Sequence, residues 1–369
     1  MSPAQDEGVP GSVTSLSVGP RSSCAIVDGA SLWCWGSPGH GLLGDSPGPG
    51  PVRLVQGEEL TALAVGDDRV CYAAAGVPHC FGVVRGFGTY DYGYYSEPTI
   101  ARSPERVRGL EEVDAISVAR NQSCFLSAGV TRCLGSAEGG AGAGARSSRF
   151  GAEMTRDARS LATGATHTCV AEGDGKVTCW GSASAGQLPG TQIRGFVREG
   201  KELDGLGGIR QVASSPTGAL TCALGSEDAV TCWGTAGDFL DGAGMDLGEG
   251  LVALEGAGEP IARIAVGLLD VYAVAESGAL YRYSVRGPEP AAEVRNGVRL
   301  RTELVGPESV DTPPVADVGV GLSHTCALGQ DRHVRCWGLP IGGRLGSESE
   351  RAVSADEPVV VRFEAVEDE

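Results

Sequence analysis

The sequence has little lysine, few aromatic residues and no long hydrophobic run. Only Lys176 and Lys201 among its 29 basic residues are lysines, and 47 acidic residues give a net charge of −18. Nucleic-acid binders need basic surface to contact phosphates, so we expect no nucleic-acid partner. No apolar stretch approaches the roughly 20 residues of a membrane-spanning helix. The chain also begins without a basic and apolar leader, so we expect neither a membrane span nor a signal peptide in it.

Common catalytic and metal-binding motifs are also missing. There is no Gly-x-Ser-x-Gly, no His-Glu-x-x-His, no phosphate-binding loop, no Cys-x2-Cys knuckle and no Asp-x-Asp-x-Asp calcium loop. The glycine-alanine run 140–144 resembles a dinucleotide fingerprint, but no strand–helix–strand pattern surrounds it. We therefore predict a protein that is not an enzyme and that binds no metal or cofactor.

Glycine and cysteine, in contrast, are abundant and regularly placed. The 58 glycines interrupt nearly every block of ten residues, which favours short strands and turns over helices. Twelve cysteines form six pairs spaced by nine or ten residues: 24 and 34, 71 and 80, 124 and 133, 169 and 179, 222 and 232, 326 and 336. The largest gap between pairs contains one more unit, in which Tyr272 and Arg282 occupy the cysteine positions. The period is about 50 residues.

Each unit predicts the same local structure. An apolar segment ending in glycine precedes the first cysteine, as in residues 16–19 and 318–321. Two alternating runs joined by a short glycine turn then read as a β-hairpin. Seven such units are each too small to bury their own faces, so they must pack on one another. A closed propeller leaves only short sheet edges, so it is favoured over a linear solenoid.

The motifs resemble a known repeat family. Cys34-Trp35-Gly36, Cys179-Trp180-Gly181 and Cys336-Trp337-Gly338 are each followed by a glycine-leucine motif, and His167 and His324 precede cysteines at one repeated position. These features are similar to the regulator-of-chromosome-condensation repeat, and the doubled cysteines look like its bacterial branch. The resemblance implies a single seven-bladed, all-β propeller of four-stranded antiparallel blades. We expect it to span residues 13–363, between a disordered segment 1–12 and an acidic tail 364–369.

Ring closure is predicted from the two ends of the chain. Residues 358–363 form an extended segment after the last hairpin, and no such segment precedes Val13. We expect this C-terminal segment to complete the blade that holds residues 13–36.

Hairpin register predicts a disulfide within each cysteine pair. The turn Ala128-Gly129 places Cys124 opposite Cys133 at a non-hydrogen-bonded site, where the Cα atoms lie about 4.5 Å apart and a disulfide fits. The same reasoning applies to Cys24–Cys34, Cys71–Cys80, Cys169–Cys179, Cys222–Cys232 and Cys326–Cys336. The alternative is twelve buried thiols in a cytoplasmic protein. Stable disulfides imply an oxidising compartment, so we expect an exported bacterial protein, whether periplasmic, surface-attached or secreted, whose leader is absent from this sequence.

Two other repeated positions predict packing rather than chemistry. Trp35, Trp180, Trp233 and Trp337 each follow a cysteine, so they point to the opposite sheet face and should pack on a neighbouring blade. Five tryptophans are too few for a light-sensing cluster of the kind found in a plant relative. The two repeated histidines should bond to backbone of their own blades.

One segment predicts a partner-binding surface. Tyr90, Tyr92, Tyr94 and Tyr95 lie among glycines and aspartates between the second and third units, a composition typical of adaptable contact surfaces. The alternative is a loop folded onto its own blade. We expect a monomer that binds a protein, or alternatively a glycan. A guanine-nucleotide exchange factor, by family resemblance, and a propeller-based hydrolase or lyase remain as alternative functions.

Overall fold

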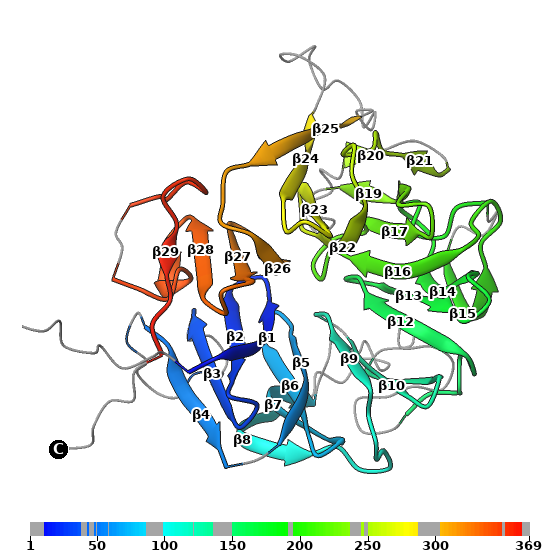
Figure 1. Ribbon diagram of the computed structural model, residues 1–369. Coiled ribbons are helices and arrows are strands. Elements are labelled where there is room, and N and C mark those ends of the chain that lie inside the picture. The colour runs from blue at the N-terminus through cyan, green and yellow to red at the C-terminus, as the bar shows by residue number, and fades with distance from the viewer. Residues whose placement is uncertain are drawn as a thin grey trace, which may run out of the picture.

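The computed structural model describes residues 11–37, 43, 48, 50–57, 59–85, 99–120, 122–135, 150–190, 195–236, 245–246, 250–286, 303–348 and 351–363. Seven antiparallel sheets surround a common centre (Figure 1). Each sheet is a meander of strands consecutive in sequence, as the hairpin repeat predicts. The described residues contain no helix long enough to span a membrane. The expected N-terminal segment and acidic tail fall, apart from residues 11 and 12, outside the described residues.

The strands of the first four sheets have the following bounds. They are β1 (Val13–Val18), β2 (Ser22–Val27), β3 (Ser31–Gly36) and β4 (Val52–Gln56); β5 (Leu60–Val65), β6 (Arg69–Ala74), β7 (Val77–Arg85) and β8 (Thr99–Arg106); β9 (Ala115–Val118), β10 (Gln122–Ser127) and β11 (Val130–Gly135); β12 (Ala158–Thr163), β13 (His167–Glu172), β14 (Val177–Ser182) and β15 (Phe196–Glu202). In the third sheet the fourth position is taken by residues 151–154, where Gly151 and Met154 donate backbone hydrogen bonds to β11.

The remaining three sheets repeat the pattern. They contain β16 (Ile209–Ser214), β17 (Thr221–Gly225), β18 (Val230–Trp233) and β21 (Val252–Ala253); β22 (Ile261–Val266), β23 (Asp270–Ala275), β24 (Leu280–Arg286) and β25 (Glu303–Val310); β26 (Val315–Val320), β27 (His324–Gly329), β28 (Val334–Gly338) and β29 (Val359–Val360). A small ribbon of β19 (Thr235–Ala236) and β20 (Met245–Asp246) extends the fifth blade. The protein is thus a seven-bladed propeller.

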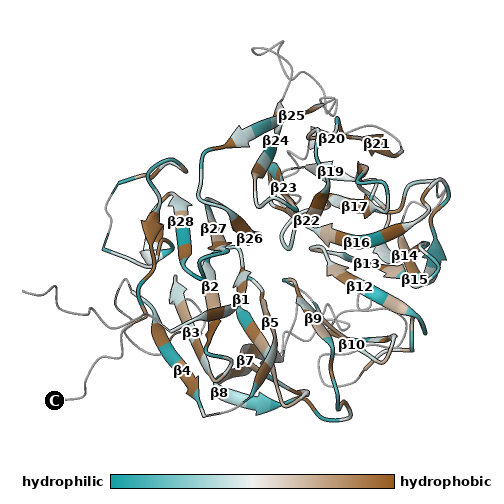
Figure 2. Ribbon diagram, in the orientation of Figure 1, coloured by the Kyte–Doolittle hydropathy of each residue, from teal (hydrophilic) through white to brown (hydrophobic). Residues whose placement is uncertain are grey.

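The hydrophobic core is divided into seven layers, one between each pair of adjacent blades. Each buried cluster combines residues of two neighbouring sheets, and the layer between the seventh and first blades is built like the other six. The outer strands β8, β15 and β25 carry hydrophilic stretches, whereas the innermost β16, β22 and β26 contain hydrophobic ones (Figure 2). No blade buries its faces without both neighbours.

The short distance between the innermost strands of adjacent blades explains the glycine that ends each apolar segment. A Cβ atom on Gly19 would lie 2.6 Å from Val65 Cγ1 and 2.7 Å from the Gly66 carbonyl oxygen of the next blade. A Cβ on Gly66 would in turn meet Val118 of the third blade at 2.6 Å. Real Cβ contacts are longer than these, so only glycine permits this approach.

All six expected disulfides are present. Within each pair the cysteines are directly opposite in the hairpin register, with Cα atoms 4.0 to 4.2 Å apart. In the sixth blade Tyr272 and Arg282 face each other at the same site. Each disulfide faces the following blade and each aromatic residue after the second cysteine faces the preceding one, as the alternation of a strand requires.

The expected pairing of residues 358–363 with the first blade is wrong. β29 pairs with β28 of the seventh blade, and the first blade is completed by its own β4. Each of the seven units runs from its first to its fourth strand in sequence order, so every blade takes its fourth strand from its own unit. Among the described residues, side chains connect the C-terminal segment to the first blade: Val361 is buried with Trp33 and Trp35, and the Phe363 ring lies about 6 Å from both indoles.

Replacing Gly19, the glycine that ends the first apolar segment, tests the close approach of adjacent blades. Gly19→Ala should destabilise the fold by about 1–3 kcal/mol, because the methyl group meets backbone atoms that cannot move aside. Gly256→Ala, at a position with nothing within 4 Å of the added Cβ, is the matched control. Chemical denaturation without reductant measures both, and equal midpoints for the two variants would contradict this packing account.

The disulfides provide a second test. Eleven of the twelve cysteines are 0% exposed and Cys80 is 6% exposed. Denatured, unreduced protein should therefore contain almost no free thiol, and the folded protein should resist reductant until it unfolds. Each bond closes a loop of about ten residues, so complete reduction should lower stability by about 2–3 kcal/mol per bond on the chain-entropy model. Twelve free thiols in protein from an oxidising compartment would refute the pairing.

Candidate functional site

The two ends of the propeller differ in what they carry. At one end of the propeller, the loops between first and second strands contact the ends of the third strands. The backbone N–H groups of Ser37, Val83 and Leu339 donate hydrogen bonds to the carbonyl oxygens of Arg21, Asp68 and Ser323, in that order. We call this end the connection face; it consists of the loops between first and second strands and the flanks of the connections between third and fourth strands. The opposite end, the turn face, carries the hairpin turns.

The connection face carries the long segments of the chain. Between strands with described bounds, the connections from third to fourth strand contain 13 to 20 residues, whereas the hairpin turns of the other end contain two to four. Tyr90, Tyr92, Tyr94 and Tyr95 belong to the connection between β7 and β8 and lie outside the described residues. The two residues that bound this connection, Arg85 and Thr99, pair with each other.

A ring of buried polar side chains lies just beneath the connection face. These side chains occupy the first position of the second strand, and each bonds to the following blade. Arg69 Nη1 donates to Ser123 Oγ (2.6 Å), and Gln122 Nε2 donates to the carbonyl oxygens of Gly164 and His167 (3.1 and 2.7 Å). This position therefore ties adjacent blades together.

The two repeated histidines belong to the same ring. His167 Nε2 lies 2.6 Å from Thr221 Oγ1, and His324 Nε2 lies 3.0 Å from Ser23 Oγ of the first blade. Their expected role is structural, but the expected partners were wrong: each bonds a hydroxyl of the following blade instead of backbone in its own. The reason is that a side chain at this position points across the blade interface.

Burial controls the charge of these groups. Desolvation lowers the pKa of His167 to about 4, and burial with the nearby positive charge of Arg344 lowers the pKa of His324 to about 3. Both imidazoles are therefore neutral at pH 7. Burial also lowers the pKa of Arg69 to about 9, while Asp68 opposes the shift, so this guanidinium keeps its charge at neutral pH.

The tryptophans anchor the connections. Trp35 Nε1 donates to the Arg344 carbonyl oxygen of the seventh blade (3.2 Å), and Trp233 Nε1 donates to the Gln187 carbonyl oxygen of the fourth (2.9 Å). The motifs Gly186-Gln187-Leu188 and Gly343-Arg344-Leu345 thus provide the acceptors for the indoles of the blades that follow them. All five tryptophans are at most 7% exposed, which leaves no tryptophan cluster on the surface.

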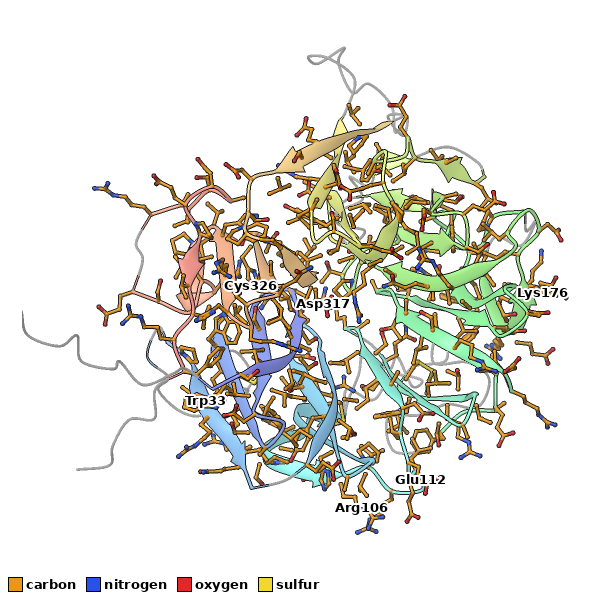
Figure 3. The ribbon with its side chains drawn as sticks, in the orientation of Figure 1. Trp33, Arg106, Glu112, Lys176, Asp317 and Cys326 are labelled. Carbon is orange, nitrogen blue, oxygen red and sulfur yellow. A yellow bond between two sulfur atoms is a disulfide. The ribbon has the colours of Figure 1, made fainter. Side chains whose placement is uncertain are left out.

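A cavity of about 240 Å³ lies at the centre of the ring, between the seven first strands. Its polar lining comes from Ser17, Ser117, Thr163, Ser214 and Asp317. Asp317, near the ring centre in Figure 3, is the one charged residue of this lining, and burial raises its pKa while Arg263 lowers it. The lining thus lacks the second carboxylate that glycoside hydrolysis would use. Among the described residues no group of three His, Cys, Asp or Glu side chains could hold a metal ion.

Sequence reasoning missed part of this site. Arg69 and Gln122 share the register position of His167 and His324, yet only the histidines attracted notice because their identity repeats. Aligning the units by hairpin register instead of by residue type would have revealed all four.

The buried histidines predict how stability depends on pH. Their folded pKa values lie below the unfolded value of about 6.5, so the unfolded chain binds more protons between about pH 6.5 and 4. Stability should fall as pH drops through that range, by about 2 kcal/mol per histidine at pH 5. His167→Gln and His324→Gln should each remove the share of this loss that comes from the replaced histidine, because glutamine does not titrate. The position accepts glutamine, since Gln122 fills it in the third blade.

Guanidinium denaturation of the oxidised protein at pH 7 and pH 5 measures this effect. The His333→Gln variant, at a partly exposed histidine outside the blade interfaces, is the control and should keep the steep fall. An equally steep fall in the variants that lack His167 and His324 would contradict the assignment.

Comparison with known proteins agrees with this architecture. The family model described as "Regulator of chromosome condensation (RCC1) repeat" matches residues 158–187 and 315–340. The curated ultraviolet-B receptor of Arabidopsis thaliana is 24% identical, over 91% of this chain and 79% of the receptor. Both matched repeats contain a ring histidine and a disulfide.

Solved structures show the same fold. Human WBSCR16 superposes with a TM-score of 0.63 at 18% identity, covering 90% of this chain and 94% of that protein. Prp20 of Saccharomyces cerevisiae, described with its binding to Gsp1p and histones, superposes with a TM-score of 0.51 at 16% identity, covering 95% and 77%. The ectodomain of the Arabidopsis receptor kinase ACR4 also reaches 0.51 at 16% identity, covering 90% and 97%. Two segments of the chain therefore match the regulator-of-chromosome-condensation repeat, and the whole chain shares the propeller fold of proteins built from it.

Proposed function

We propose that this protein is a non-catalytic interaction scaffold that binds a protein partner through its connection face. The observation that carries the proposal is the asymmetry of the propeller: the 13- to 20-residue connections all begin and end at one face, and the other face has hairpin turns of two to four residues and links between blades of three to eight. Long loops held on a rigid scaffold are where binding residues concentrate. Yeast Prp20, a propeller of this fold, is described bound to Kap60, which is consistent with such a role.

The tyrosine-rich connection is the proposed contact. Tyr90, Tyr92, Tyr94 and Tyr95 follow β7 and precede β8, so their segment starts and ends at the connection face. Tyrosine supplies large contact area at low conformational cost, and neighbouring glycines supply adaptability. A protein surface is the favoured ligand; a glycan would also suit tyrosine rings.

We further propose that the protein works in an oxidising, extracellular or periplasmic environment. Six disulfides in one chain support this, because reducing compartments keep cysteines as thiols. The disulfides stiffen the hairpins beneath the connection face, and a rigid base lowers the entropy lost when a loop binds.

Replacing all four tyrosines by serine tests the binding role. Loss of aromatic anchors should weaken partner binding by about 2 kcal/mol or more, roughly 30-fold or more in affinity, with a nearly unchanged melting temperature. Partners are isolated with the wild-type protein from native host material, and their affinities are then measured for both proteins. Tyr281→Ser, at a partly buried tyrosine bonded to Glu259, is the control.

Two results would overturn the proposal. Unchanged affinity would remove the tyrosines from the interface, and a large fall in melting temperature would show that they pack on their own blade. Nucleotide exchange on a small GTPase, catalysed by the wild type, would replace the scaffold function with the exchange-factor alternative.

A further inference from the structure

The junction between the first and last blades brings two arginines to one place on the connection face. Arg21 lies in the loop between β1 and β2, and Arg344 follows β28 and the 3₁₀ turn Ile341–Gly343 of the seventh blade. Leu322 N–H, in the loop between β26 and β27, donates to the Pro20 carbonyl oxygen (3.0 Å), and Gly342 lies against Ser37, whose N–H donates to the Arg21 carbonyl oxygen. In the described part of the chain no strand pairs across this junction, so side chains and loops hold it.

Arg344 is half-buried and is held at its carbonyl oxygen and at one guanidinium nitrogen. Its carbonyl oxygen accepts the Trp35 indole N–H at 3.2 Å, and its Nη1 donates to Ser323 Oγ at 2.6 Å. The Nε–H is buried and has no hydrogen-bond partner among the described residues. Ser323 accepts from Arg344, so its own hydroxyl proton remains available to donate.

Arg21 approaches the same place from the first blade. Its Nε lies 3.3 Å from Asp67 Oδ1 of the second blade, and its side chain is 44% exposed whereas that of Asp67 is 10% exposed. Ser37 N–H donates to the Arg21 carbonyl oxygen at 2.9 Å, which fixes the backbone. The guanidinium is thus positioned by one carboxylate and open to solvent.

Charge at the junction is unbalanced. Burial and the neighbouring charge of Arg21 both lower the pKa of Arg344, and Asp67 alone opposes them. Among the described residues, Asp67 is the carboxylate that acts on both guanidinium groups, through the ion pair with Arg21 and through its charge on Arg344. Guanidinium forks bind carboxylate and phosphate through paired N–H donors, so an oxyanion here would relieve the repulsion.

We propose that Arg21, Arg344 and Ser323 form an oxyanion-binding site that clamps the first blade to the last. Its ligand is a carboxylate or phosphate group, presented by a partner or free in solution. The site is independent of the tyrosine-rich connection, and it joins the two ends of the chain where the propeller has no shared blade.

Thermal unfolding with simple anions tests the site. Inorganic phosphate and acetate are the probes, each compared with chloride at equal ionic strength. An anion at about ten times its dissociation constant should raise the melting temperature by about 2 °C. Arg344→Gln and Arg21→Gln should each remove the rise, whereas the exposed Arg198→Gln on β15 should keep it, together with any general salt effect.

Nuclear magnetic resonance gives a second readout that does not depend on the variants folding. The Nε–H signals of Arg21 and Arg344 in ¹⁵N-arginine-labelled wild-type protein should shift and saturate with the anion, while that of Arg198 should not. A response to phosphate alone assigns a phosphoryl ligand, and an equal response to acetate assigns a carboxylate. Unmoved Arg21 and Arg344 signals, or a melting-temperature rise that survives both substitutions, would overturn the proposal.

Discussion

Packing of one blade on the next is the constraint on which this structure depends. A four-stranded sheet with two apolar faces cannot exist alone in water, and here every buried cluster draws residues from two adjacent sheets. Near the axis the sheets come so close that a side chain at Gly19 would strike the backbone of the next blade. Further out, the same interface is filled by a disulfide from one side and an aromatic ring from the other.

The polar ring beneath the connection face solves a problem created by that packing. Close approach buries the ends of the strands, and a buried polar group is costly unless it is hydrogen-bonded. Arg69, Gln122, His167 and His324 meet part of this requirement across the interface, while Gln122 Oε1 and the Nδ1 atoms of both histidines find no partner among the described residues. These bonds run in one direction, from the second, third, fourth and seventh blades to the blade that follows each, so they hold these blades in register as well as in contact.

Ring closure in this protein relies on side chains instead of a shared blade. The junction of the chain ends has a histidine–hydroxyl bond like that between the fourth and fifth blades and an apolar layer like those of the other junctions, and it adds Phe363 against two indoles. It differs in carrying two arginines, Arg21 and Arg344, at the connection face, where a bound anion would stabilise the closed ring. An anion bound at this junction would raise the stability of the folded protein without changing the structure of any blade.

The sequence alone determined the number of blades, the hairpin register and the disulfides, because these follow from local spacing. A two-residue turn sets which residues face each other, so Cys124 opposite Cys133 could be derived without knowing what surrounds the hairpin. Only the tertiary structure decided how the blades meet. The direction of the histidine bonds, the part played by Arg69 and Gln122, and the pairing of β29 with β28 all depend on which sheet lies beside which. The same holds for the meeting of Arg21 and Arg344: they are 323 residues apart in the sequence, and only closure of the ring brings them together.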